Sequence, residues 1–103
     1  MTIIKKVSEM IQEELEDACN YAKCALKYKD DYPSLAKAFY QLSTEESEHA
    51  RILHGEVVKL IESYRRDNGE PPEAMQAVYD YLHEQQIEKA NKARMYQEQF
   101  KNY

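Results

Sequence analysis

The chain has 103 residues, enough for one small domain and too few for two independent hydrophobic cores. It holds 2 glycines and 3 prolines and 32% charged residues, so we expect an all-α domain rather than a turn-rich sandwich or barrel. The net charge of −5 disfavours nucleic acid as a partner, and no apolar run is long enough for a membrane span or a signal peptide. The spacing of Cys19 and Cys24 fits no common metal or disulfide motif, so we expect a reduced, cytoplasmic protein.

Two turn signals divide the chain into helical segments, expected at about residues 3–29, 34–66 and 73–101. The first signal ends at Pro33, because proline suits the first turn of a helix. The second is Asn68-Gly69, a helix stop, followed by Pro71-Pro72. We expect residues 1–103 to form one domain, an antiparallel helical hairpin with a third long helix against it.

The first two segments each carry an apolar stripe at alternating spacings of three and four residues, which predicts a face buried in a bundle. In the first segment the stripe comprises Ile4, Val7, Ile11, Ala18, Tyr21, Ala25 and Tyr28. In the second it comprises Leu35, Phe39, Leu42, Leu53 and Leu60, widened by Ala36, Ala50, Val57 and Ile61.

The third segment has an irregular apolar face that includes Val78, Tyr81 and Met95. We expect Tyr81 to fill the bundle with its ring, and His54 and His83 to be ordinary surface histidines. Three helices of this length leave one side of the bundle open. We therefore predict a homodimer or a higher homo-oligomer that covers this side.

Four ionisable residues interrupt the stripes, and three of them point to a metal site. Glu46 and His49 lie three apart on one helix, so their side chains project from the same face. Glu14 lies on the facing stripe, and the midpoint between it and residues 46–49 falls at about residue 31, in the predicted turn. The three side chains should therefore meet at one depth, where they suit iron or manganese, or alternatively zinc. The fourth residue, Glu56, is expected to reach solvent.

The stretches from Glu14 to Tyr21 and from Glu46 to Ala50 resemble the first helical hairpin of the rubrerythrin-like branch of the ferritin-like superfamily. In that family a tyrosine follows the first-helix glutamate by seven residues, and the second helix carries Glu-x-x-His-Ala. The resemblance implies that Glu14 and Glu46 are metal-ligating carboxylates, with Glu46 bridging, and that His49 is a terminal ligand. It places Tyr21 beside the site, and a looser match in the third segment makes Glu88 a further ligand.

The chain departs from the family pattern because it has no fourth helix, no second Glu-x-x-His and no rubredoxin-like cysteine module. Two arrangements would complete the site. A two-fold dimer could bring together the ligands of two chains, as in the encapsulated ferritins, which are similar in using one hairpin per chain. Alternatively, the third helix could complete a smaller site within one chain. We favour the dimer.

The resemblance implies a metal-binding protein with a non-haem di-iron carboxylate site. As an enzyme it would be an oxidoreductase of the ferroxidase or peroxidase type, with iron as the cofactor and Mn²⁺ or Zn²⁺ as alternatives. The competing hypothesis is a metal-free interaction or scaffold protein that keeps the ferritin-like hairpin.

Overall fold

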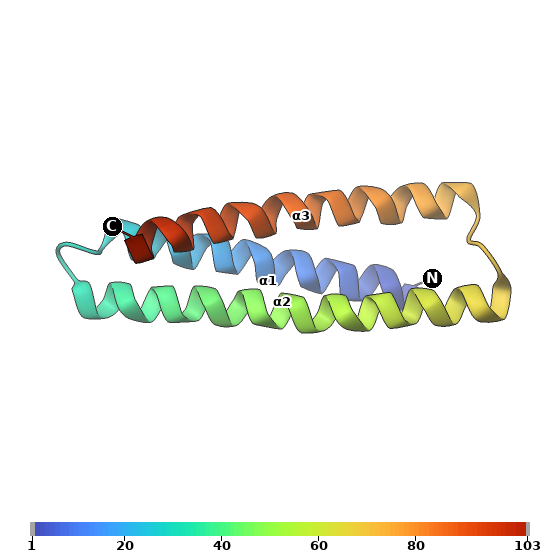
Figure 1. Cartoon of the computed structure of the whole chain (residues 1–103), viewed down its shortest axis with the longest axis horizontal. Coiled ribbons are helices and arrows are strands. Elements are labelled where there is room, and N and C mark those ends of the chain that lie inside the picture. The colour runs from blue at the N-terminus through green and yellow to red at the C-terminus, as the bar shows by residue number, and fades with distance from the viewer. Residues whose placement is uncertain (1, 103) are drawn as a thin grey trace.

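The computed structural model describes residues 2–102, and these form three long helices with no strand among them. The helices are α1 (Thr2–Lys27), α2 (Pro33–Asn68) and α3 (Glu73–Asn102). α2 runs antiparallel to α1, and α3 turns back to run in the same direction as α1 (Figure 1). The result is a rod of 55 × 19 × 18 Å, and the expected all-α fold is confirmed.

The helix boundaries follow the turn signals, with small differences from the expected ranges. α1 ends at Lys27, and the residues after it form a turn in which the N–H of Tyr32 donates to the carbonyl oxygen of Tyr28. Pro33 is itself the first residue of α2, because its ring fixes a helical φ and no N–H is required there. α2 continues to Asn68 and stops at Gly69, whose φ of 76° is accessible to glycine without strain.

α1 is the central helix of the three. It packs closely against both α2 and α3, whereas α2 and α3 make few contacts with each other. In Figure 1, α1 accordingly lies between the other two helices. Two regions of the molecule are therefore left without a covering helix: the groove between α2 and α3, and the face of the α1–α2 hairpin that points away from α3.

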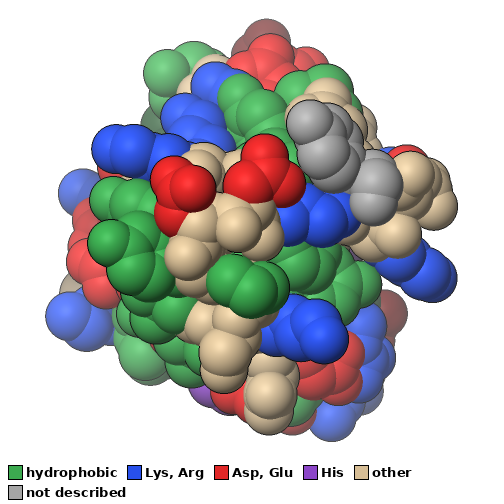
Figure 2. Space-filling view, turned by 90° about the vertical axis from the view of Figure 1, so that its left-hand side faces the viewer, with side chains coloured by type: hydrophobic (Ala, Val, Ile, Leu, Met, Phe, Trp, Pro, Cys, Tyr) green, Lys and Arg blue, Asp and Glu red, His purple; other side chains and the backbone are tan. Residues whose placement is uncertain are grey.

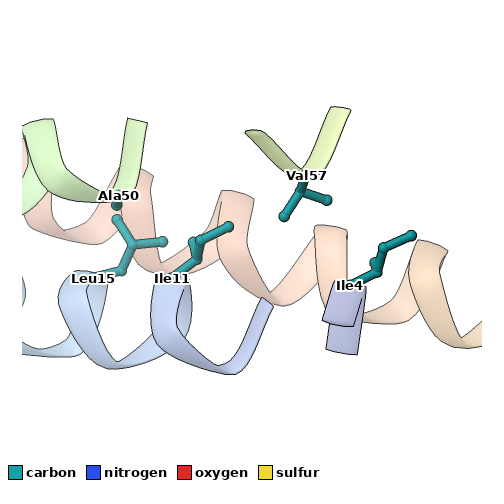
Figure 3. Packing of buried hydrophobic residues seen from close by; sticks show 5 residues of the cluster. All are labelled: Ile4, Ile11, Leu15, Ala50 and Val57. Carbon is teal, nitrogen blue, oxygen red and sulfur yellow. The ribbon is translucent and has the colours of Figure 1, made fainter. Parts of the chain in front are cut away.

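The larger hydrophobic cluster joins α1 to α2. Its buried members are Ile4, Ile11, Leu15, Ala50 and Val57. The α1 side chains point toward α2, where those of Ala50 and Val57 face them (Figure 3). A second, smaller cluster comprises Ala18, Cys19 and Ala93, so Cys19 is a packing residue as expected.

Some residues that we expected to be buried are not. Leu35 and Leu42 are 47% and 38% exposed, and Tyr81 on α3 is 61% exposed. The face of α2 buried in this chain consists instead of Ala36, Ser43, Ala50 and Val57. These small residues allow the helices to approach closely, and the stripe of larger side chains then lies at the edge of the contact. Figure 2 shows the end of the rod that carries the α1–α2 turn, where hydrophobic side chains reach the surface between charged ones.

No helix within residues 2–102 combines the length and apolarity needed to cross a membrane.

Candidate metal centre

The structure brings Glu14 of α1 together with Glu46 and His49 of α2. One ligand atom from each residue lies within 4.8 Å of the other two. The three residues meet because equal helical rises on both sides of the turn bring them to the same depth of the hairpin. The geometry therefore agrees with the depth inferred from the sequence.

The imidazole lies between the two carboxylates. Nδ1 of His49 is 3.4 Å from Oε2 of Glu14 and 3.7 Å from Oε1 of Glu46. Ligand atoms bound to one transition-metal ion about 2.1 Å away are separated by roughly 3.0–3.4 Å. Small side-chain movements would therefore let all three residues bind one cation.

The group is partly buried, and its exposure rises toward the open face. The side chains of Glu46 and Glu14 are 20% and 29% exposed, whereas that of His49 is 54% exposed. The carboxylates lie between the two helices, while the imidazole stands on the uncovered surface. The sequence pattern had suggested a buried position for all three, and for His49 within a single chain this is wrong.

The two carboxyl groups raise the proton affinity of the site. The pKa of Glu46 is raised to about 7, first by a hydrogen bond shared with Glu14 and then by burial and the negative charge of Glu14. The charge of His49 lowers the pKa of Glu46, and the negative charge of Asp17 raises it further. A cation at this position would replace the shared proton and neutralise both carboxylates.

The chemistry of the donor set fits a metal ion. Oε2 of Glu14 is buried and has no hydrogen-bond partner within residues 2–102. A buried carboxylate oxygen without a donor is costly, and bonding to a cation removes this cost. Two carboxylates and one imidazole are ligands typical of iron and manganese in proteins.

α3 lies on the opposite side of the hairpin from this group. Lys89 of α3 reaches Glu16 of α1 at 3.9 Å, and Glu16 points nearly opposite to Glu14 because residues two apart on a helix differ by about 200°. Glu88 is exposed on α3, and the structure does not bring it to the other three ligands. Its assignment as a ligand stays a prediction.

Tyr21 lies two turns beyond Glu14 on the same face of α1, about 10 Å further along the helix. Its ring stacks on that of Phe39, with centroids 6.1 Å apart. Phe39 in turn precedes Glu46 by seven residues. The two rings therefore form an aromatic contact between α1 and α2, about two helical turns from the carboxylates.

Asp17 is a residue of the site that the sequence interpretation missed. It follows Glu14 by three residues, so it projects from the same face of α1, and that spacing could have identified it. Its carboxylate is exposed, and its negative charge raises the pKa of Glu46. Glu56 is exposed and pairs with Lys59 at 3.1 Å, in agreement with its expected solvent position.

Comparison with known proteins gives one result. A family model described as Rubrerythrin matches residues 6–102, which include all three helices and the three clustered ligands. No curated protein and no solved structure matched the chain.

Proposed function

The chain belongs to the rubrerythrin family, and we propose that it binds iron through Glu14, Glu46 and His49 at a centre shared between two copies of the chain. The observation that carries this proposal is the buried Oε2 of Glu14, which accepts no hydrogen bond within residues 2–102 and lies 3.4 Å from Nδ1 of His49. Manganese and zinc are the alternative metals, since the same ligands accept them.

A second copy supplies what one chain lacks. Two glutamates and one histidine are half of the ligand set of a ferritin-like di-metal centre. His49 is exposed on a face that α3 does not cover, and exposed apolar side chains of Met10, Leu42 and Ile52 lie one turn from the ligands. Two such faces packed about a two-fold axis would bury these side chains and place both ligand sets in one four-helix bundle.

Bound iron supplies one-electron redox chemistry, suited to the oxidation of Fe(II) by dioxygen or to the reduction of peroxide. Glu14, Glu46 and His49 would hold the metal, and the two carboxylates would neutralise its charge. On binding, Glu46 would give up its proton, Glu14 would contribute the buried oxygen that accepts no hydrogen bond, and the exposed imidazole of His49 would complete the set.

The proposal is tested by anaerobic Fe(II) loading of the apo-protein, with iron counted per chain. We expect about one iron per chain and its loss in Glu46→Gln, because half of a di-metal centre belongs to each copy. Glu45→Gln is the matched control, since Glu45 is the exposed neighbour of Glu46. The Glu45→Gln protein should bind as much iron as the original protein. About two irons per chain would place the centre within one chain.

The absence of variant-sensitive iron, manganese or zinc would overturn the proposal and favour a metal-free scaffold. In that case the double variant Glu14→Leu/Glu46→Leu should be at least as stable as the original protein. Partly buried carboxylates without a cation are costly, and leucine removes that cost.

A further inference from the structure

The groove between α2 and α3 is lined by polar side chains that are not part of the carboxylate group. Two cavities of about 300 and 570 Å³ lie along it. Three polar residues line both cavities: His54 of α2, and His83 and Gln86 of α3. The sequence predicted two surface histidines, and the structure places His83 on the surface and His54 partly exposed. The packing of α3 in addition brings the two rings together, which the sequence did not indicate.

The two imidazoles lie at a separation suited to a shared metal ion. Their ring centroids are 5.4 Å apart, with an angle of 43° between the ring planes. With metal–nitrogen bonds of 2.0–2.1 Å, two imidazoles on one tetrahedral ion have their centroids about 5 Å apart. His54 and His83 therefore need little movement to bind one ion.

Gln86 offers a third polar side chain at the same place in the groove. It is 7% exposed, and it lines both cavities together with His54 and His83. Gln86 follows His83 by three residues on the same face of α3, so its carbonyl oxygen is available as a third donor in the groove.

We propose that His54, His83 and Gln86 form a second metal site, which binds a divalent ion of the Cu²⁺, Ni²⁺ or Zn²⁺ type and links α2 to α3. Neutral nitrogen donors favour these ions over Mg²⁺ and Ca²⁺, which prefer sets of oxygen ligands. Water completes the coordination, since the groove is open along its length. Arg51, which also lines the groove, is held by the carboxylate of Glu48.

The second site is separate from the carboxylate group. His49 and His54 are five residues apart, so their side chains leave α2 in directions that differ by about 140°. One faces the open side of the hairpin and the other faces α3. Variants can therefore remove either site while leaving the ligands of the other in place.

Cu²⁺ electron paramagnetic resonance tests the proposal on the full chain carrying His49→Ala, which removes the imidazole of the carboxylate group. We expect one Cu²⁺ per chain with splitting from two nitrogen nuclei. Adding His54→Gln or His83→Ala should remove this signature and weaken Cu²⁺ binding at least tenfold. A spectrum and affinity unchanged by both additions would overturn the proposal.

Zn²⁺ gives a second readout that does not depend on the spectrum. A metal that joins two helices in the folded state stabilises it, so Zn²⁺ should raise Tm in His49→Ala and leave it unchanged in His49→Ala/His83→Ala. His83 is exposed, so this second substitution should leave the metal-free fold intact. An equal rise in both proteins would overturn the proposal without affecting the iron centre.

Discussion

Two carboxyl groups held side by side repel each other, and at this site the effect is concentrated on Glu46. Its ordinary pKa of 4.5 rises to about 7 through the hydrogen bond with Glu14, through burial and through the charge of Glu14. The folded protein therefore holds a proton between pH 4.5 and 7 that the unfolded chain has released. The same proton competes with a metal ion for the carboxylates.

The metal-free protein should become less stable as the pH rises from 5 to 8 because of this group. Between these values the native state binds more protons than the unfolded state, so the free energy of unfolding falls as the proton is lost. After allowance for solvent screening, the fall is on the order of 1 kcal/mol. Urea unfolding at both pH values would measure it.

The matched variants are Glu46→Gln, which removes the titrating group, and Glu45→Gln, which alters an exposed neighbour. Glu46→Gln should lose this part of the pH dependence, and Glu45→Gln should keep it. Equal pH dependence in Glu46→Gln and the unchanged chain would show that Glu46 does not carry the effect.

At the scale of the helices, a polar contact joins all three elements at one point. The hydroxyl of Ser43 on α2 donates to the carbonyl oxygen of Ala18 on α1 at 2.5 Å. The side-chain amide of Gln97 on α3 donates to Ser43 at 2.8 Å and to Ser47 at 3.1 Å. Because α2 and α3 otherwise make few contacts, these bonds help fix the position of α3.

Replacing Gln97 with methionine keeps the length of the side chain and removes both donors to α2. We expect the free energy of unfolding to fall by about 1 kcal/mol, the usual net value of a hydrogen bond or two at a partly exposed position. Amide hydrogen exchange in the second half of α3 should become faster.

Gln99→Met is the control, because Gln99 is exposed and makes no hydrogen bond with residues 2–102. Comparable losses of stability in the two variants would indicate a general effect of methionine on α3. The contact with Ser43 would then have no special part in positioning the helix.

At the scale of the whole molecule, the rod is extended and leaves much of its hydrophobic surface uncovered. The radius of gyration is 16.4 Å, against about 13 Å for a compact domain of this length. Leu35 and Leu42 are exposed on the face that carries Glu46, and Ile52 is exposed one turn after His49. A second copy seated on this face would bury them, as the proposed shared centre requires.

Leu42→Glu should weaken the proposed homo-oligomer, because it places a carboxylate in the proposed contact on each chain. We expect the dissociation constant to rise at least about tenfold, since burying an uncompensated charge costs more than 1.4 kcal/mol. Sedimentation velocity over a range of concentrations measures this change, and iron bound per chain should fall with it.

Val78→Glu is the matched control, because Val78 is an apolar residue on α3 that is 51% exposed, against 38% for Leu42. It should leave association and iron content unchanged. A Leu42→Glu protein that associates like the unchanged chain would contradict the proposed contact face, whatever its iron content.

The helices and the axial position of the site follow from local features of the amino-acid sequence. Pro33 and Gly69 set helix boundaries through fixed or permitted φ values, and these depend on local chemistry alone. A constant rise per residue then made the depth of Glu14, Glu46 and His49 calculable from the position of the turn. For these reasons the hairpin and its ligand group were predictable.

The tertiary structure decided which faces of the helices are covered. The predicted stripe lies close to the face of α2 that is buried. Small residues such as Ala36 and Ala50 let the helices approach closely, so Leu35 and Leu42 lie at the edge of the helix contact. The side of α1 to which α3 docks, and with it the meeting of His54 and His83, depends on many small contacts between distant segments. Helical periodicity fixes none of these, because it describes one helix at a time.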